Sequence, residues 1–232
     1  MGDQIKQTIV VQKGKQILNE RGRSAFDIEA TGLGVRKGSA GGPIMINMIR
    51  PFEIAIGTDM SGSISKLLHE KACLNSHLIA GSALAVTPIA PIELMEGNQS
   101  QLEMACKVNQ HLQNDSSVLF SFNGIGYDAI ILRHFFFENL LDPYLLSYED
   151  RLHIDLLCVS HAARDFSNKV NFLINEKGKK SLRQIDIALA NDIDPGKAHT
   201  AIDDVDTLLQ IARLYEDQIP EIFYTSVICG NK

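Results

Sequence analysis

The sequence predicts one α/β domain in which helices cover a mixed β-sheet. Two observations support that prediction: apolar runs of strand length occur in the first half of the chain, and strands alternate with helices after them. The 232 residues suffice for one full hydrophobic core. Apolar residues make up 45% and charged residues 22%, as in ordinary globular proteins, and no apolar run reaches the ~18 residues of a membrane span. We therefore expect no association with a membrane.

The N-terminal part of the chain is polar and weakly patterned. We expect a short extension or a first hairpin over 1–24 and the main domain over 25–232. A strand is predicted at about 25–29, and the run FEIAIGT predicts a second strand at 52–58. The glycine-rich stretch 32–43 lacks the spacing of a phosphate-binding P-loop, so it predicts a flexible loop.

Three elements are expected in the middle of the chain. Ser100 and Glu103 form a capping box, which predicts a helix from there to about residue 113. The run VLFSF at 118–122 is apolar throughout, as in a buried central strand. The segment 128–141 predicts a largely buried helix.

The C-terminal third predicts helices. Asp155 precedes a pair of leucines and is expected to cap a helix. Ser181 and Gln184 match a second capping box, before a helix that ends near Ala190. The last helix is predicted from about Thr200 onward, to Asp217.

The charge and cysteine content limit the class of protein. The formal net charge of −6 argues against a protein that coats nucleic acid, although an enzyme that grips one strand end is compatible with it. The densest basic cluster comprises Lys177, Lys179, Lys180 and Arg183. It predicts a solvated loop, or alternatively a surface that guides a phosphate backbone. The four cysteines are scattered and the N-terminus lacks a signal-peptide core, so we expect reduced thiols and a cytoplasmic location.

The run FDIEATG carries the first candidate site. Asp27 and Glu29 would share one face of a strand, roughly 6–7 Å apart, while Phe26 and Ile28 face the other way. Two carboxylates in an apolar strand are costly unless a positive charge lies between them, and a divalent cation is the usual solution. The alternative is a solvated strand end.

Three more residues are candidates for the same site. Asp204 falls in line with Leu208, beside the apolar stripe of the last helix, where a carboxylate needs a partner; a buried cap or salt bridge is the alternative. His199 is expected on the loop before that helix. Asp128 follows a strand and a glycine-containing turn, although an acid at a helix start is also favoured by the helix dipole.

Together these residues match three ordered motifs. FDIEATG, then N-x-x-x-Y-D from Asn123 to Asp128, then H-x-x-x-x-D from His199 to Asp204, resemble the exonuclease motifs of the DEDDh 3′→5′ exonucleases. The resemblance is closest to the nuclease domain of exodeoxyribonuclease I and covers roughly 25–215. It implies a ribonuclease-H-like fold.

The resemblance also implies a chemistry. Asp27, Glu29, Asp128 and Asp204 would bind two divalent ions, Mg²⁺ or Mn²⁺, and His199 would be the general base. The implied reaction is hydrolysis of single-stranded DNA from its 3′ end with release of 5′-mononucleotides. Substrate contacts are expected from Thr31, Leu33, Asn123 and Tyr127.

Some features depart from the family pattern. Ala30 stands where many relatives carry a hydroxyl residue, and the glycine-rich loop is longer than usual. The chain ends soon after the nuclease region, which implies weaker processivity. Other readings of the same sequence are a relative that trims RNA or proofreads for a polymerase, a non-catalytic nucleic-acid-binding or scaffold protein on this fold, and one domain of a larger assembly.

Overall fold

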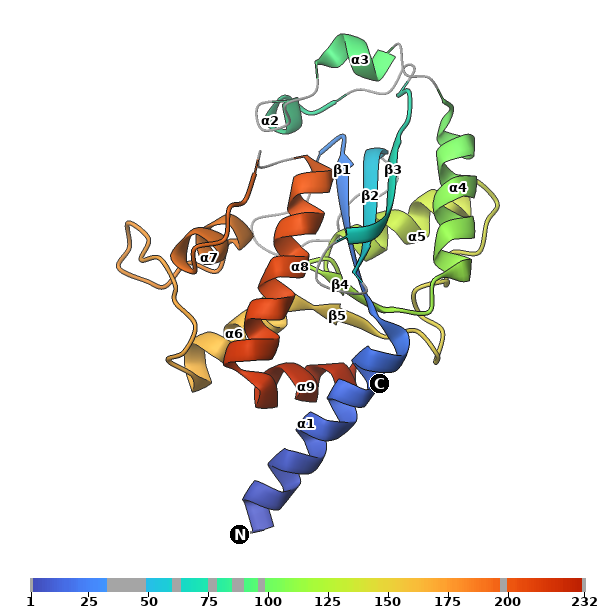
Figure 1. Ribbon diagram of the computed structural model, residues 1–232. Coiled ribbons are helices and arrows are strands. Elements are labelled where there is room, and N and C mark those ends of the chain that lie inside the picture. The colour runs from blue at the N-terminus through green and yellow to red at the C-terminus, as the bar shows by residue number, and fades with distance from the viewer. Residues whose placement is uncertain are drawn as a thin grey trace, which may run out of the picture.

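The structure is a computed structural model, and it describes residues 2–32, 49–59, 64–74, 79–84, 90–95, 99–196 and 200–230. It has one mixed sheet of five strands in the order β3-β2-β1-β4-β5 (Figure 1). The strands are β1 Arg23–Ala30, β2 Pro51–Asp59, β3 Ile64–Lys71, β4 Val118–Ser121 and β5 His153–Asp155. The first three strands form an antiparallel meander, and β4 and β5 extend it in parallel to β1.

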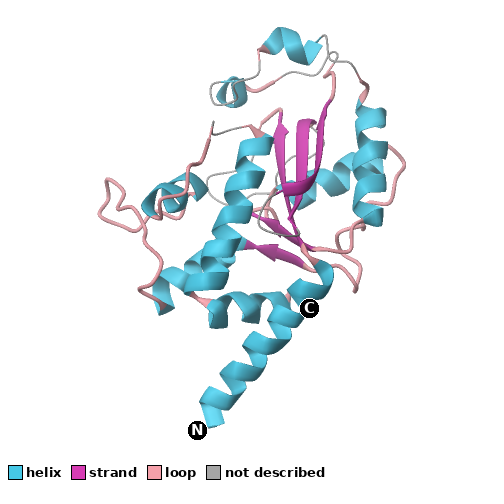
Figure 2. Ribbon diagram, viewed as in Figure 1, coloured by secondary structure: helices cyan, strands magenta, loops and turns pink. Residues whose placement is uncertain are grey.

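Helices cover both faces of this sheet (Figure 2). The described helices are α1 Gly2–Arg21, α2 Gly81–Leu84, α3 Pro91–Met95, α4 Gln101–Asn114, α5 Asp128–Glu138, α6 Leu156–Phe166, α7 Gln184–Ala190, α8 Ala201–Gln218 and α9 Pro220–Cys229. Helices α4 and α5 lie on one face, and α8 crosses the other face with α6, α7 and α9 around it (Figure 1). None of the described helices is long and apolar enough to cross a lipid bilayer.

Alternation along β1 and β2 divides the core into two layers. Phe26 and Ile28 are buried with the apolar side chains of α4 and α5. Ala25 and Ala55 are buried on the opposite face with residues of α8. On that second face, the close approach of α8 to β2 depends on Gly57, because a Cβ at this position would lie 2.7 Å from the side chain of Val205 in α8. The odd-numbered residues of β1 therefore face α8.

Within the region 1–24, where an extension or a hairpin was expected, Gly2–Arg21 form helix α1 and strand β1 already begins at Arg23. Helix α1 projects from the body and packs its C-terminal half on α9 (Figure 1). Leu18 is fully buried, and Gly14 allows the contact because a Cβ at that position would lie 2.6 Å from Tyr224. The helix is stabilised by this tertiary contact, which its weak apolar pattern does not reveal. The boundary between 1–24 and 25–232 stays a prediction.

Most other expected elements are present. The capping box at Ser100 is confirmed, since its hydroxyl accepts the Glu103 N–H and the Glu103 carboxylate accepts the Ser100 N–H. The strands at 52–58 and 118–122 are also confirmed. The helix predicted from about Thr200 to Asp217 is α8, but it is not the last helix, because α9 follows it. Helix α5 ends at Glu138, three residues before the predicted end.

The second capping box is wrong. Helix α7 begins at Gln184 after Arg183, and the Ser181 hydroxyl donates to the carboxylate of Asp186. The same carboxylate pairs with the guanidinium of Arg183. A salt bridge thus replaces the expected side-chain cap.

Candidate metal centre

Three of the predicted carboxylates meet between β1 and α8. Asp27 and Glu29 lie on the face of β1 that α8 covers, and Asp204 lies in the first turn of α8. One oxygen of each can be chosen so that all three lie within 4.8 Å of one another. All three residues are partly buried. The sequence placed Asp204 beside the apolar stripe of its helix, and the structure shows that this direction leads to β1.

The start of α8 is fixed by a cap. The Thr200 hydroxyl accepts the N–H of Asp203 at 3.3 Å, and the Thr200 carbonyl accepts the N–H of Asp204 at 3.0 Å. The first bond satisfies an N–H group that the first helical turn cannot pair internally, and the second is the first backbone hydrogen bond of the helix. They also fix the turn that carries the Asp204 carboxylate against β1.

Asp128 reaches the centre from the other side, as the first residue of α5. Its side chain is buried, and its charge acts on Asp27 more strongly than any other neighbouring charge. The preceding turn is tight: Asn123 has a φ of 61°, and a Cβ at Gly124 would lie 2.3 Å from the Ser121 hydroxyl. Asp128 is not part of the 4.8 Å group, so it completes the centre as a more distant fourth carboxylate.

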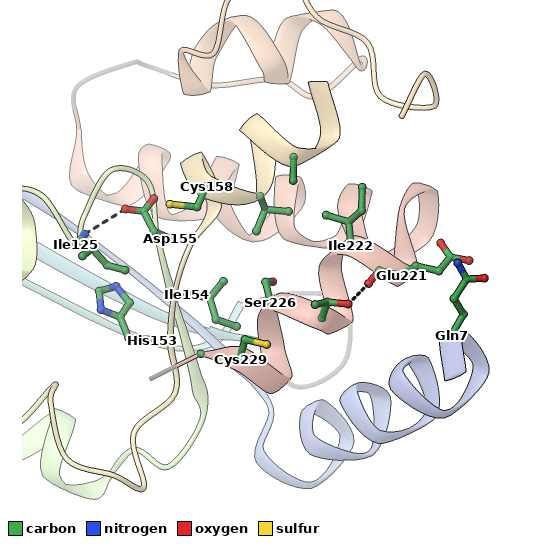
Figure 3. Close-up of a pocket in the computed structure, with 14 residues that line it drawn as sticks. Gln7, Ile125, His153, Ile154, Asp155, Cys158, Glu221, Ile222, Ser226 and Cys229 are labelled. Atoms are coloured by element: carbon green, nitrogen blue, oxygen red, sulfur yellow. Dashed lines mark hydrogen bonds between the residues drawn. The ribbon is translucent and has the colours of Figure 1, made fainter. Parts of the chain in front are cut away.

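Asp155 holds this turn in place. Besides capping α6 through the Leu157 N–H, as predicted, its carboxylate accepts the N–H groups of Asn123 at 2.8 Å and Ile125 at 3.2 Å. Figure 3 shows Asp155 reaching Ile125 at one end of a pocket of about 630 Å³, which β5, α6 and α9 line with mostly apolar side chains. None of the four clustered carboxylates lines that pocket.

The electrostatics of the centre are those of crowded anions. Burial raises the pKa of Glu29 to about 8, with further contributions from the charges of Asp204, Glu53 and Asp128. Burial and the charges of Asp128 and Asp204 raise the pKa of Asp27 well above its usual range. Without a counter-charge, therefore, several of these carboxyls hold protons near neutral pH.

Asp128 follows the same pattern with a different neighbour. Burial raises its pKa to about 7; a backbone hydrogen bond opposes this shift and the charge of Asp155 adds to it. Asp155 thus stabilises the turn before Asp128 and disfavours its ionised form. A cation beside Asp128 would offset that cost.

The donor set fits a hard divalent cation. Carboxylate oxygens are the ligands that Mg²⁺ and Mn²⁺ prefer, and two oxygens on opposite sides of one Mg²⁺ ion are about 4 Å apart. One oxygen from each of the three residues lies within 4.8 Å of the other two, which is compatible with a shared ion. Burial and neighbouring carboxylates raise the pKa values of Asp27 and Glu29, and a divalent cation would supply the positive charge that offsets this repulsion.

The predicted substrate contacts have other partners in this structure. The Thr31 hydroxyl accepts the N–H of Arg50 at 2.9 Å and the residue is buried. The Tyr127 hydroxyl donates to the carbonyl of Gly32 at 2.7 Å, which ties the end of β1 to the turn before Asp128. Asn123 is exposed at that turn. Their contacts with a substrate stay predictions.

Two predicted site residues lie outside the described part of the chain. These are His199 and Leu33, and most of the glycine-rich stretch 32–43 lies outside it as well. One residue that the sequence reasoning missed is Glu53, a buried carboxylate on β2 next to Glu29. Its signal was a single charge inside the apolar run FEIAIGT.

Comparison with known proteins agrees with the motifs. Exodeoxyribonuclease I of Haemophilus influenzae is 28% identical over 153 residues, which cover 64% of this chain and 32% of the relative. Exodeoxyribonuclease I of Escherichia coli is 26% identical over 151 residues, with 64% and 32% covered. These matches confirm the resemblance to exodeoxyribonuclease I. No family model matches the sequence. The chain spans about a third of the length of these curated relatives.

Solved structures give the fold. The crystal structure of E. coli exonuclease I in complex with a dA16 oligonucleotide superposes with a TM-score of 0.77 at 23% identity, over 87% of this chain and 42% of that one. A zinc-bound form of the E. coli exonuclease I complex with single-stranded DNA gives a TM-score of 0.75 at 22% identity, with the same coverage. The predicted ribonuclease-H-like fold is thereby confirmed.

Proposed function

We propose that this protein is a metal-dependent 3′→5′ exonuclease that releases 5′-mononucleotides from single-stranded DNA. The observation that carries the proposal is the meeting of Asp27, Glu29 and Asp204 within 4.8 Å, with Asp128 acting on Asp27 from α5. The four residues come from three separate segments of the chain, in the order of the exonuclease motifs. A protein that only binds nucleic acid has no need of such a costly cluster.

The cluster would hold two divalent ions, with Mg²⁺ as the expected ion and Mn²⁺ as a substitute. Asp27, Glu29 and Asp204 are the candidate ligands on one side, and Asp128 is the candidate on the other. Bound ions supply the positive charge that stabilises the attacking and leaving oxygens of a phosphodiester. The protein contributes the rigid placement of the four carboxylates on β1, α5 and α8.

The proton transfer is assigned to His199. An imidazole with an ordinary pKa near 6.5 accepts a proton from the attacking water at neutral pH. His199 directly precedes Thr200, the residue that caps α8, and Asp204 follows in the first turn of that helix. Water attacks the terminal phosphodiester, the bond to the 3′ oxygen of the penultimate nucleotide breaks, and a 5′-mononucleotide leaves.

The choice of single-stranded DNA rests on the relatives. The curated ones are named exodeoxyribonuclease I, and the solved E. coli structures include complexes with dA16 and dT13 oligonucleotides. Binding of a 3′ end does not require sequence-specific contacts, because a terminal base of any kind can stack on an apolar side chain. A cytoplasmic location is part of the same proposal.

A degradation assay tests the proposal. Single-stranded DNA labelled at its 5′ end is incubated with the protein and Mg²⁺ or Mn²⁺, and the products are resolved by length. We expect stepwise shortening from the 3′ end, which stops with EDTA and with Asp27→Ala. Shortening that survives both controls would overturn the assignment of the carboxylates.

A matched RNA oligonucleotide defines the substrate. We expect DNA to be degraded faster than RNA of the same sequence. Faster degradation of the RNA would show that RNA is the preferred substrate, since contacts to the 2′-hydroxyl decide this preference. No shortening of either substrate with either ion would reject the nuclease assignment.

A further inference from the structure

A fifth carboxylate lies beside the candidate metal centre. Glu53 of β2 is the direct cross-strand partner of Glu29, so the two side chains project from the same face of the sheet. The Glu53 side chain is only 1% exposed. Its charge is among those that raise the pKa of Glu29 and Asp27, which places it close to both. Like charges directly opposite each other destabilise a sheet, so this pairing needs a compensating contact.

Among the described residues, partners are found for only one oxygen of Glu53. Oε1 lies 2.6 Å from Nε2 of His69 and 3.6 Å from Nζ of Lys71. Oε2 is buried and has no hydrogen-bond partner among the residues that the structure describes. A buried carboxylate oxygen without a donor is costly, so Oε2 needs a donor that the described residues do not supply, such as a bound water molecule.

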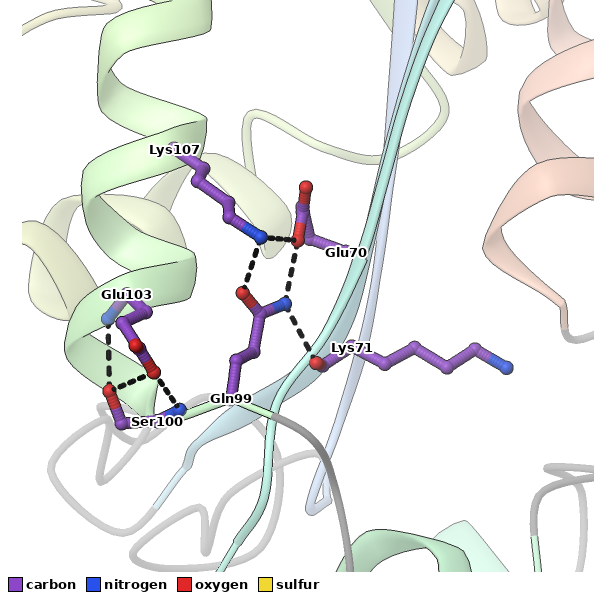
Figure 4. A network of polar contacts seen from close by, with 6 residues as sticks. All are labelled: Glu70, Lys71, Gln99, Ser100, Glu103 and Lys107. Atoms are coloured by element: carbon purple, nitrogen blue, oxygen red, sulfur yellow. Dashed lines mark hydrogen bonds and ion pairs between the residues drawn. The ribbon is translucent and has the colours of Figure 1, made fainter.

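The register explains how this arrangement is built. Lys71 is the cross-strand partner of Glu53, so Lys71, Glu53 and Glu29 form one row across β3, β2 and β1. Figure 4 shows the alternation along β3: Glu70 turns toward Lys107 of α4, and the Lys71 side chain leaves on the opposite side. The row thus runs from an exposed lysine at the sheet edge to the centre.

We propose that Glu53 is a positioning residue of the cation site: Oε2 accepts a hydrogen bond from a water molecule bound to the cation that Glu29 holds, while His69 and Lys71 fix Oε1. The inference rests on the proposed function, since it presupposes that the carboxylates bind a divalent cation. Partners of this kind orient metal ligands, and their loss typically costs about 10–100-fold in metal affinity.

The experiment measures Mn²⁺ binding by titration calorimetry, without substrate. Glu53→Met removes both oxygens at similar side-chain length. Glu53→Gln removes the charge and keeps an acceptor for His69 and Lys71, so its NH₂ group, which cannot accept a hydrogen bond, faces the site. Glu70→Met on the other face of β3 is the matched control. Each variant is first melted without metal to show that it is folded.

We expect Glu53→Met to weaken Mn²⁺ binding by about 10–100-fold at unchanged stoichiometry. Glu53→Gln should weaken binding to a similar extent, and Glu70→Met should bind like the wild type. Unchanged binding by Glu53→Met would overturn the inference. So would a Glu53→Gln variant that binds like the wild type, because its NH₂ group cannot accept from the water, or the loss of one bound ion, which would indicate a direct ligand. Absence of Mn²⁺ binding by the wild type would instead reject the proposed function.

Discussion

The carboxylate of Asp155 accepts the backbone N–H of Asn123 at 2.8 Å, across the ends of two neighbouring parallel strands. Asn123 follows β4 and begins the turn that delivers Asp128, whereas Asp155 ends β5. The bond therefore links β5, which carries no candidate ligand itself, to the turn that positions the candidate ligand Asp128. Because Ile125 donates to the same carboxylate, the whole turn depends on this side chain.

Asp155→Ala should destabilise the fold by about 3 kcal/mol or more, since three partly buried N–H groups lose their acceptor, one of them the Leu157 N–H that Asp155 caps at the start of α6. Asp155→Asn should cost less, because Asn123 and Leu157 share Oδ1, which the amide oxygen can replace. Urea unfolding of the three proteins tests this order. An equal loss of unfolding free energy in both variants would show that an acceptor at the position of Oδ1 does not stabilise the fold.

Asp27→Asn should abolish activity and stabilise the metal-free protein at pH 8. The loss of activity should be about 10³-fold or more, since each ~1.4 kcal/mol of lost transition-state stabilisation is tenfold in rate. The melting temperature without metal should rise by about 5 °C, because the variant removes a carboxyl whose pKa burial and the charges of Asp128 and Asp204 raise well above its usual range.

The matched control for this prediction is Asp206→Asn. Asp206 is an exposed residue of α8 that bonds to Gln210, so its replacement should change the melting temperature by little. A lower melting temperature for Asp27→Asn in the absence of metal would contradict the view that the centre is a destabilised cluster.

His199→Ala should lower turnover by about 10²–10⁴-fold, the usual contribution of a general base. Metal affinity measured by calorimetry should stay within about threefold of the wild type, because the four carboxylates remain in place. Loss of metal binding in this variant would make His199 a ligand or a structural residue.

Local patterns predicted those features of the site that depend on one element. The alternation in FDIEATG placed Asp27 and Glu29 on the face opposite to Phe26, and the helical period placed Asp204 on the inner side of α8. These directions follow from the periods of strand and helix alone. The order of the three motifs along the chain then led to the prediction that these carboxylates share one metal site.

Features that depend on pairing between distant segments were not predictable in this way. The neighbourhood of Glu29 and Glu53 arises from the register of β1 and β2, and a shift by one residue would turn Glu53 to the other face. Helix α1 forms because Gly14 and Leu18 meet a helix at the other end of the chain. Neither fact leaves a periodic signal in the local sequence.

Tyr127→Phe and Tyr127→Ala separate two roles of this side chain. Phe removes the hydroxyl that donates to Gly32, which should cost about 1 kcal/mol of stability, but keeps the ring. Ala also removes a surface for base stacking worth about 1–3 kcal/mol, so KM for an oligonucleotide should rise about 5–150-fold in Ala only. Equal KM values for the two variants would exclude a stacking role for Tyr127.

The stability of the metal-free protein should fall as pH rises from 7 to 8.5. The folded-state pKa values of Glu29, about 8, and Asp128, about 7, lie above those of the unfolded chain, so the folded state holds more protons in this window. Stability from these groups is fully present below their unfolded pKa values and is lost as pH passes about 7–8. Below pH 6.5 the trend is mixed, because burial lowers the pKa of His153 to about 4 and acid then destabilises the fold.

Thermal melts from pH 7 to 8.5 with and without Mg²⁺ test this dependence. Saturating Mg²⁺ should abolish the fall, because the bound ion displaces the protons and stabilises the carboxylates, and calorimetry in buffers of different ionisation enthalpy should show proton release on binding. Glu29→Gln should make the metal-free melts less dependent on pH. A melting temperature that rises with pH in the metal-free wild type would mean that the carboxyls are already ionised, and that a positive charge of the protein itself compensates them.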